Sequence, residues 1–336
     1  MRNSSRASDE PGRGAGVRPA PAPGPPVASG SAGPVALPPA AVGAAPPRRR
    51  SKYGLATYGF LLPGFLLYAL FLLYPLGRSV QISLFEWDGL SLATFVGLDN
   101  YVDVFADPQL RASFEHALVL IFFFAVLPLL IGLVLAAVLT RGQVRGLGFF
   151  RTIVFLPQVV AMVVVAVAWR QIYAPDGTLN TFLRWLGLDS WTRTWLGDFT
   201  LTLPAVGLIG TWVCTGLVTV LLMAGMSRVP GELYEAATLD GAGAVRKFFS
   251  ITLPSVRAEI VVALTLTIIA ALKTFDLVYV TTAGGPGSTT TVPSYEVYRR
   301  AFQLGEVGSA AAIAVVLTVL IFAINLAVNR IGERNR

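Results

Sequence analysis

The chain has 336 residues, of which 54% are hydrophobic and only 13% carry a charged side chain. Its mean hydropathy of +0.65 is far above that of a soluble domain of this length. The single histidine, His116, and the single cysteine, Cys214, exclude a disulfide framework and a metal site built from histidine and cysteine ligands. The net charge of +7 would suit a nucleic-acid-binding protein. The positive residues follow a membrane topology instead, so no nucleic-acid partner is expected.

Residues 1–52 are predicted to form a disordered cytoplasmic tail. Half of the prolines, 11 of 22, fall in residues 1–47, where they alternate with alanine, glycine and serine. Such a composition cannot bury a core. A cleaved signal peptide is the alternative interpretation. The first apolar run begins too late, is too long and lacks a small-residue cleavage site, which favours an uncleaved anchor.

Six apolar runs follow within the predicted membrane domain, residues 53–336. Each is close to the roughly 20 residues that cross a bilayer as a helix. The runs lack the alternation of apolar and polar residues that membrane barrels show, so they predict helices. The expected fold class is an all-α integral membrane protein with six transmembrane helices. The predicted spans are about 54–77, 117–140, 152–172, 203–226, 259–280 and 308–329.

The distribution of charge predicts the topology. Arginine and lysine cluster before the first span and in alternate loops, which is typical of cytoplasmic segments. The segment between the first and second spans is rich in aspartate and glutamate, as an outer loop would be. With six spans, both termini are then expected to be cytoplasmic. The clustered positive residues are Arg48, Arg49, Arg50, Lys52, Arg141, Arg145, Arg151, Arg228, Arg246, Lys247 and Arg257.

The loop between the fourth and fifth spans predicts two short helices joined by a turn. Pro230 stands where a helix can start, and Glu232 and Glu235 favour the positive end of the helix dipole. This helix should end near Asp240, and Gly241 stands where the chain must turn and where a positive φ is natural. A second short helix is expected from about residue 243 until a Leu-Pro pair closes it. The sequence thus predicts a helix-turn-helix on the cytoplasmic face.

This loop resembles the signature loop of binding-protein-dependent ATP-binding-cassette (ABC) importer permeases, in its Glu-Ala-Ala start and its Ile-x-Leu-Pro finish. The resemblance implies the type I permease fold, with a core transmembrane domain over about 113–329. It also implies that the loop docks into a cleft of an ATPase subunit. An amphipathic interfacial helix is the alternative, although paired alanines and a glycine suit protein packing better than lipid contact. The implied coupling residues are Glu235, Ala236, Ala237, Asp240, Gly241, Ile251, Leu253 and Pro254.

Further stretches resemble the carbohydrate-uptake permeases of the maltose and glycerol-phosphate type, over roughly residues 55–330. Many members of that family have an Asn-Thr pair where this chain has His116-Ala117. The resemblance implies a multi-pass permease of the bacterial plasma membrane, in contact with lipid. Its implied partners are a second permease subunit, a dimer of ATPase subunits, an extracytoplasmic solute-binding protein and a sugar-like solute. The matching stretches are residues 95–101, 151–157, 273–280 and 284–286.

Four residues within the spans are candidates for the solute path or its gate. Lys273 and Asp276 are spaced i, i+3 on one predicted helix, so they either form a structural ion pair or contact the solute. Tyr279 and Trp212 either stack against a sugar ring or pack against helices and lipid. The sequence leaves both pairs of alternatives open.

The sequence contains no Gly-x-x-x-x-Gly-Lys-Ser/Thr phosphate loop, and residues 284–288 lack the lysine that such a loop needs. The chain is therefore expected to be a transporter subunit without an enzyme activity or cofactor of its own, and ATP would be bound by a partner. An ion-driven secondary transporter and an intramembrane enzyme are the rival classes. Nearly charge-free central spans disfavour the first, and a lone histidine far from a lone cysteine disfavours the second. The sequence does not specify the solute.

Overall fold

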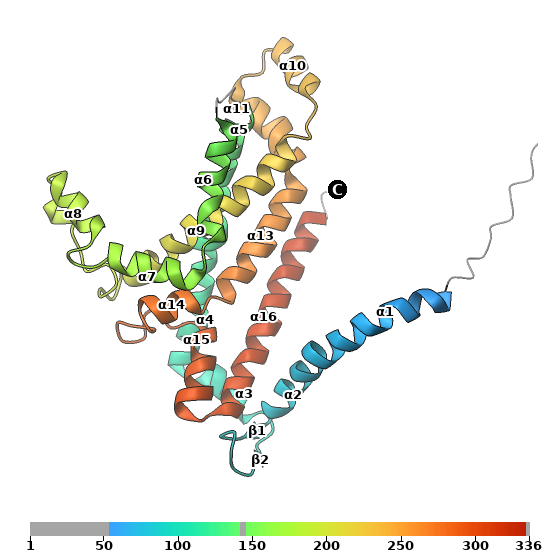
Figure 1. Ribbon diagram of the computed structural model, residues 1–336, viewed down its shortest axis with the longest axis vertical. Helices are drawn as coiled ribbons and strands as arrows, with labels where there is room; N and C mark the ends of the chain where they lie inside the picture. The colour runs from blue at the N-terminus through green and yellow to red at the C-terminus, as the bar shows by residue number, and fades with distance from the viewer. Residues whose placement is uncertain (1–53, 142–145, 334–336) are drawn as a thin grey trace, which may run out of the picture. The chain divides into compact units, whose positions relative to one another are not determined.

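The computed structural model describes residues 54–141 and 146–333 (Figure 1). The predicted tail, residues 1–52, lies outside the described residues. The chain divides into two units, residues 1–58 and 59–336. The helices and contacts given below belong to the second unit, apart from the first turn of helix α1. Within the described ranges, the regular secondary structure is helical except for one two-stranded ribbon, which confirms the predicted all-α fold class.

The described chain begins with a long apolar helix that leads into a small polar cap. Its elements are α1 (Gly54–Tyr68), the π-helical turn η1 (Ala69–Leu73), α2 (Tyr74–Ile82), β1 (Phe85–Glu86), β2 (Thr94–Phe95) and α3 (Asp99–Ala106). The two strands pair antiparallel, with Phe85 opposite Phe95 and the ring centroids 5.3 Å apart. Asn100 in α3 donates hydrogen bonds to the carbonyl oxygens of Ser83 and Phe85 at 2.9 and 3.0 Å. These bonds hold the ribbon against α3.

The second apolar element is a continuous helix that starts at a capped end. It consists of α4 (Pro108–Ile121), the π-helical turn η2 (Phe122–Val126) and α5 (Leu127–Arg141). The side chain of Asp107 accepts a hydrogen bond from the Gln109 backbone N–H at 2.8 Å, and Pro108 occupies the first helical position. Both choices suit a helix start, because Asp107 satisfies one backbone N–H of the first turn and proline has no N–H that needs a partner.

The third predicted span is a bent pair of helices rather than one helix. The elements of this region are α6 (Leu147–Val159), α7 (Met162–Ile172), α8 (Thr178–Trp185) and the 3-10 turn η3 (Asp189–Trp191). The axes of α6 and α7 differ by 97°. Val160 and Ala161 between them have extended ψ angles of 135° and 133°, and Pro157 removes a backbone donor from the last turn of α6. Hydropathy misses this break because both sides of it are apolar.

Helix α9 (Thr202–Met226) is the most buried of the candidate membrane spans. Small residues bring its neighbours close. A Cβ at Gly216 would collide with the backbone carbonyl of Val154 in α6, and one at Gly210 would collide with the ring of Phe124. Thr211 Oγ1 also donates to the carbonyl oxygen of Phe123 at 2.7 Å. Small residues and interhelical hydrogen bonds of this kind hold helices together in lipid, where the hydrophobic effect between helices is absent.

Gly216→Ala is expected to destabilise the chain by about 1 to 3 kcal/mol, the range for overpacked interiors. The added methyl group meets backbone atoms of α6, which cannot rotate away as a side chain could. Thermal unfolding of the purified chain in detergent measures the effect. Gly148→Ala is the matched control, because nothing lies within 4 Å of a Cβ at that glycine. Equal melting temperatures for the two variants would contradict the close approach of α6 and α9.

The fifth predicted span, 259–280, is interrupted. The remaining elements are α10 (Gly231–Leu239), α11 (Ala244–Lys247), the π-helical turn η4 (Phe248–Thr252), α12 (Leu253–Ser255), α13 (Arg257–Leu272), α14 (Asp276–Thr281), α15 (Pro293–Tyr298), the π-helical turn η5 (Arg299–Leu304) and α16 (Val307–Glu333). Helix α13 ends at Leu272, and residues 273–275 are not helical. Four helices of the described chain are long and apolar enough to cross a membrane, or six if each of two bent pairs counts as one span.

Three of the π-helical turns have a proline as the second residue after their end. The prolines are Pro75 after η1, Pro128 after η2 and Pro254 after η4. Proline has no N–H, and its ring clashes with the carbonyl group four residues earlier. In all three cases that carbonyl group belongs to the π-helical turn. We infer that the wider turn accommodates the ring, which lets the helix continue past the proline.

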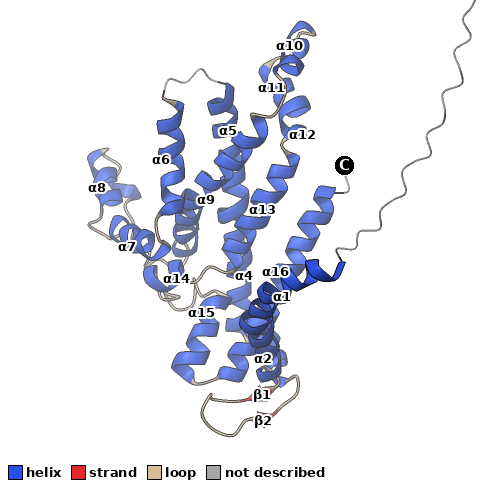
Figure 2. Cartoon of the chain, turned by 45° about the vertical axis from the view of Figure 1, so that its right-hand side comes forward, coloured by secondary structure: helices blue, strands red, loops and turns tan. Residues whose placement is uncertain are grey.

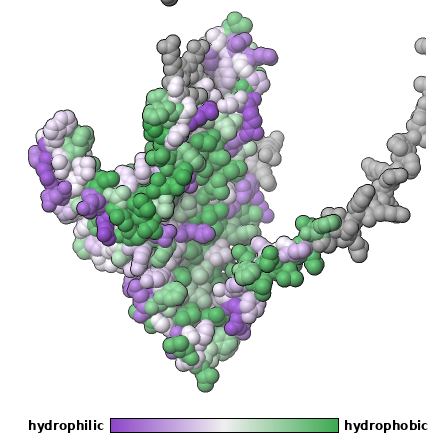
Figure 3. All heavy atoms as spheres, viewed as in Figure 1, coloured by the Kyte–Doolittle hydropathy of each residue, from purple (hydrophilic) through white to green (hydrophobic). Residues whose placement is uncertain are grey.

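The two ends of the helix bundle differ in charge. Helices α10 and α11 lie at one end, near the C-terminal end of α5, whereas the ribbon and α3 lie at the opposite end (Figures 1 and 2). The first end carries Arg246 and Lys247, and the second carries Asp99 and Asp103. Between them, hydrophobic residues gather over α5, α6 and α9 on the face in Figure 3. This arrangement agrees with the predicted alternation of loops, and the cytoplasmic location of the α10 end stays a prediction.

Cysteine labelling tests this topology. Cys214 is buried, so a Cys214→Ser chain is a suitable background for single cysteines at Asp103 and Arg151, both of which are exposed. An impermeant thiol reagent added to intact cells is expected to label position 103 and to spare position 151. Permeabilised cells, in which both positions should react, are the control. Labelling of position 151 alone in intact cells would show that the orientation is inverted.

Candidate functional site

The predicted helix-turn-helix is present between α9 and α13. Helix α10 starts after Pro230, whose extended ψ of 134° precedes the helix, and Glu232 lies in its first turn. No residue of α10 is buried, and Leu239 is 90% exposed. The side chains of this helix are therefore accessible from solvent.

The turn after α10 has the hydrogen-bond pattern of a Schellman motif. The N–H of Ala242 donates to the carbonyl oxygen of Ala237 at 2.9 Å, and the N–H of Gly241 donates to that of Thr238 at 3.0 Å. Gly241 has a φ of +73°, as predicted for a glycine that ends a helix. No atom lies within 4 Å of a Cβ built at this position. The requirement for glycine therefore comes from the backbone conformation and not from lack of space.

The Glu-Ala-Ala face of α10 is accessible. Glu235, Ala236 and Asp240 are exposed, and Ala237 is half-buried. At the other end of the loop, Leu253 packs into a core cluster with α5 and α9. Half-buried Ile251 precedes it in the π-helical turn η4.

The expectation that a Leu-Pro pair closes the second short helix needs a correction. The helical stretch continues past Pro254 to Ser255 and ends before Val256, where it bends by 68° into α13. The π-helical turn before Pro254 accounts for the difference, because it accommodates the ring inside the helix. Pro254 is thus the second residue of α12 and does not end the helix.

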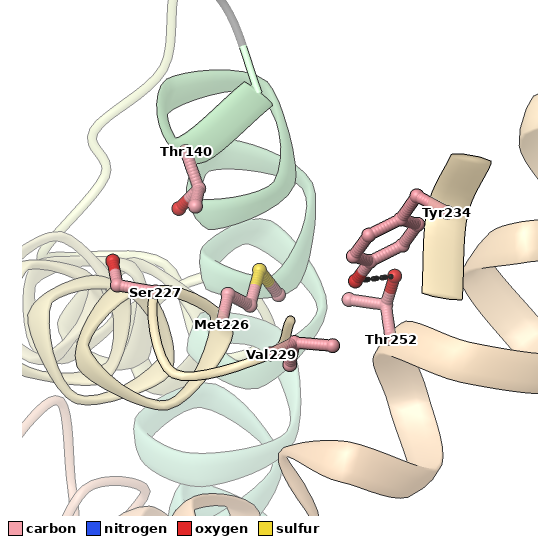
Figure 4. Close-up of a pocket in the computed structure, with 6 residues that line it drawn as sticks. All are labelled: Thr140, Met226, Ser227, Val229, Tyr234 and Thr252. Carbon is pink, nitrogen blue, oxygen red and sulfur yellow. Dashed lines mark hydrogen bonds between the residues drawn. The ribbon is translucent and has the colours of Figure 1, made fainter. Parts of the chain in front are cut away.

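A pocket of about 360 Å³ separates the loop from the ends of α5 and α9 (Figure 4). Tyr234 of α10 reaches across the loop, and its hydroxyl lies 3.0 Å from Thr252 Oγ1. A second link joins Lys247 Nζ to Thr238 Oγ1 at 2.6 Å. The two links tie α10 to the segment that returns to the membrane. The pocket is lined by Thr140, Met226, Ser227, Val229, Tyr234 and Thr252.

Lys273 and Asp276 are not brought together by the fold. Lys273 caps the C-terminal end of α13, and Asp276 is the first residue of α14, so they do not share a helix face. Both side chains are exposed, and no ion pair found among the described residues joins them. The structural ion pair, one of the two alternatives for these residues, is therefore absent from the described structure, and a contact with the solute stays a prediction. The Lys-Thr-Phe-Asp stretch interrupts the apolar run, but its composition alone does not show that the helix stops there.

Tyr279 belongs to a group of aromatic residues that sequence reasoning missed. Its ring stacks on Phe275 with centroids 5.2 Å apart and planes 18° apart, and it meets Tyr298 edge to face at 5.2 Å. Tyr298 in turn contacts Phe302, which is 79% exposed. The spacing of these aromatics along α15 and η5 was the available signal. Phe275, Tyr298 and Phe302 line a pocket of about 420 Å³ together with Lys273, Ser294 and Val297.

Trp212 lies in a different aromatic group. Its ring meets Trp169 of α7 edge to face at 5.6 Å, and Trp169 contacts Tyr173. Trp212 is 44% exposed and lines an apolar pocket of about 260 Å³ with Val160 and Val164. Its surroundings offer packing rather than hydrogen bonds.

A buried carboxylate at the end opposite α10 was also missed. Glu296 of α15 is fully buried and pairs with Arg299 at 3.0 Å. Arg300 pairs with Asp107 at 3.0 Å and with Glu306 at 2.9 Å. The network joins α15 and η5 to the start of α4 and to α16. Asp107 and Arg300 are 193 residues apart, so no local pattern could have indicated their contact.

Outside the spans, two aspartates have altered acidity. The Thr200 hydroxyl, with the backbone N–H groups of Thr200 and Leu201, holds the pKa of Asp198 below its usual value. Backbone N–H groups of Ser91 and Leu90 lower the pKa of Asp88 in the same way. Both carboxylates cap local turns, one of them directly before α9, so they shape the loops. Among the described residues, no group of three or more histidine, cysteine or acidic side chains is placed to hold a metal ion.

Comparisons with known proteins found a family model and relatives that each match more than half of the chain. The family model described as "Binding-protein-dependent transport system inner membrane component" matches residues 117–336. The "Probable ABC transporter permease protein YurN" of Bacillus subtilis is 39% identical over 80% of this chain and 93% of its own length. The "Diacetylchitobiose uptake system permease protein NgcF" of Streptomyces coelicolor is 36% identical over 89% of this chain and 91% of its own length.

Solved structures share the fold. A chain from a bacterial ABC transporter involved in the import of the acidic polysaccharide alginate matches with a TM-score of 0.72 and 24% identity. The match covers 84% of this chain and 96% of that chain. The predicted ABC permease fold is thereby confirmed.

Proposed function

We propose a transport function for this chain. The family match and the relatives show that it belongs to the family of binding-protein-dependent transport system inner membrane components. Members of the family are transporter permeases and not enzymes. We infer that the chain is the permease subunit of an ABC importer. It forms the translocation path for a sugar or sugar-like solute that an extracytoplasmic binding protein delivers.

The loop from α10 to α12 carries this proposal. Its exposed Glu-Ala-Ala face and its Schellman turn at Gly241 give a rigid element outside the lipid-facing part of the bundle, with side chains free to contact a partner. The tyrosine and lysine links across the loop would make α10 move together with the segment that returns to the membrane. We assign the contact with the ATPase to Glu235, Ala236, Ala237, Asp240 and Gly241, and the return to the membrane to Ile251, Leu253 and Pro254.

The energy source lies in partner subunits. The chain has no phosphate loop of its own, so ATP would be bound by a dimer of ATPase subunits. A second permease subunit would complete the path, because large apolar side chains remain exposed on α1, α6 and α7 and must be covered by lipid or by protein. Both termini would then lie on the same side of the membrane as the ATPase.

A sugar is the solute class that the chain supports best. The relative NgcF is named as a diacetylchitobiose uptake permease. The chain itself offers the aromatic group of Phe275, Tyr279 and Tyr298 beside Lys273, and aromatic faces with a nearby polar group suit a sugar ring. We place Lys273, Asp276 and Tyr279 at the solute path or its gate. Trp212 is a weaker member of this set, because its pocket is apolar.

Co-purification tests the proposed function. The tagged chain, expressed in its own cells and extracted in mild detergent, is expected to bring down an ATPase subunit and a second permease. The matched control is a chain in which residues 231–241 are replaced by a glycine-serine linker, which should lose the ATPase and keep the second permease. A wild-type chain that purifies without any ATPase would contradict the proposal.

A further inference from the structure

The loop that carries α10 is closed at its base by an ion pair. Arg228 follows the end of α9, and Glu259 lies in the first turn of α13, 31 residues later. Arg228 Nη2 donates to Glu259 Oε1. The pair therefore joins the two points at which the loop leaves and re-enters the bundle.

Glu259 lies in a mostly buried site between α9 and α13. Its side chain is only 15% exposed, and it lies against Gly225 of α9, where a Cβ would come within 2.7 Å of the carboxyl carbon. The glycine thus makes room for the carboxylate between α9 and α13. Its second oxygen, Oε2, is buried and has no hydrogen-bond partner among the described residues. A carboxylate in such a setting depends on its arginine, because an uncompensated buried charge is costly.

The side-chain hydrogen bonds described above join parts of the loop to each other, and Leu253 packs the return segment against α5 and α9. Tyr234 bonds to Thr252, and Lys247 bonds to Thr238, both of which lie inside the loop. These links make α10 and the return segment move together. They do not by themselves decide whether a push on α10 moves α9, moves α13 or merely tilts the loop.

We propose that Arg228 and Glu259 are positioning residues that lock the base of this loop, so that a displacement of α10 moves α9 and α13 together. The inference rests on the proposed function, since the displacement is supplied by an ATPase. Helix α9 is the most buried candidate span, and α13 packs against both α9 and α16. A shared movement of α9 and α13 would therefore reach the middle of the bundle.

Breaking this ion pair should uncouple solute uptake from ATP hydrolysis without detaching the ATPase. Arg228 is 72% exposed, so Arg228→Glu leaves the packing of the bundle intact and places two like charges together. The docking face of α10 is unchanged. The number of solute molecules imported per ATP hydrolysed is expected to fall by about fivefold or more, the lower end of ordinary coupling between sites. A purely structural defect would lower the amount of complex and leave this ratio unchanged.

The experiment compares Arg228→Glu, Arg228→Lys, Glu259→Arg and the exchanged pair Arg228→Glu/Glu259→Arg. The full complex is reconstituted in vesicles, and uptake per ATP is measured with radiolabelled N,N'-diacetylchitobiose and maltose as the probes. Amide hydrogen exchange over residues 229–256 is measured on the same preparations and on the purified chain alone. Arg330→Glu is the matched control, because Arg330 is exposed in the last turn of α16 and makes no ion pair within the described residues.

Two results in Arg228→Glu would together support the lock: faster amide hydrogen exchange in the loop, and fewer solute molecules imported per ATP hydrolysed. Both quantities should recover in Arg228→Lys or in the exchanged pair. Unchanged exchange in Arg228→Glu would overturn the lock. A lower ratio without any change in exchange would also overturn it, because Arg228 would then act by touching the ATPase directly. The exchange measurement on the purified chain keeps the two proposals separate: a wild-type chain that binds no ATPase refutes the proposed function, whereas unchanged amide exchange, or an unchanged number of solute molecules imported per ATP, refutes the lock.

Discussion

Gly241→Val is expected to abolish the coupling of ATP hydrolysis to uptake while leaving the chain in the membrane. Gly241 has a φ of +73°, and a β-branched residue there costs roughly 1 to 3 kcal/mol of backbone strain. The chain can relieve that strain by giving up the two hydrogen bonds of the Schellman turn, which would redirect α11. Solute-stimulated ATP hydrolysis in vesicles should then fall by about tenfold or more, which corresponds to roughly 1.4 kcal/mol.

Two matched variants separate backbone strain from bulk. Gly241→Asn should retain most of the stimulated hydrolysis, because asparagine tolerates a left-handed conformation. Gly243→Val places the same side chain two residues later, where φ is −69° and ψ is 171° and no atom lies within 4 Å of the added Cβ. It should behave like the wild type. If Gly241→Val and Gly243→Val lose stimulation equally, the turn conformation is not the cause.

Arg300→Met is expected to cost about 1.5 to 3 kcal/mol of folding stability, because it removes hydrogen bonds between charged groups and leaves the partly exposed carboxylates of Asp107 and Glu306 without their cation. The Arg300 side chain is 14% exposed and bonds to Asp107 and Glu306, so it joins η5 to α4 and α16. Thermal unfolding in detergent measures the loss. Arg300→Lys should recover only part of it, since an ammonium group cannot reproduce the fork of a guanidinium.

The control for this network is Arg111→Met. Arg111 is exposed on α4 and takes part in none of the ion pairs of the described residues. Its replacement should change the melting temperature little. The triple variant Arg300→Met/Asp107→Asn/Glu306→Gln should be more stable than Arg300→Met, because the unpaired charges are gone. A triple variant that is no more stable than the single one would show that packing of the arginine stem, and not its charge, holds these helices together.

The parts of this molecule that follow from local chemistry could be predicted. A helix start at Pro230, a helix end at Asp240 and a positive φ at Gly241 each depend on a few neighbouring residues, and all three are present. The apolar runs also predicted helices, because a bilayer leaves a segment of that length few other ways to bond its backbone.

Features that depend on distant contacts or on backbone breaks could not be predicted. The bend at Val160 lies within apolar sequence, so hydropathy treats it as continuous helix. The interruption at Lys273 coincides with polar residues, but their presence alone does not show that the helix stops. The pairing of Arg300 with Asp107 and of Arg228 with Glu259 joins residues that are far apart in the chain. The ion pair of Lys273 and Asp276, one of the two alternatives for these residues, does not form for the complementary reason: close spacing in sequence implies contact only if the helix continues between the two residues.

The central claim is that this chain imports its solute with energy from ATP, passed on through the α10 loop. The most direct measurement is solute uptake by vesicles that contain the whole complex and a solute-loaded binding protein. Uptake is expected to require ATP on the side of α10 and to be unaffected by ionophores that remove proton and sodium gradients. Uptake that proceeds without ATP and stops when those gradients are removed would contradict the account and identify an ion-driven transporter instead.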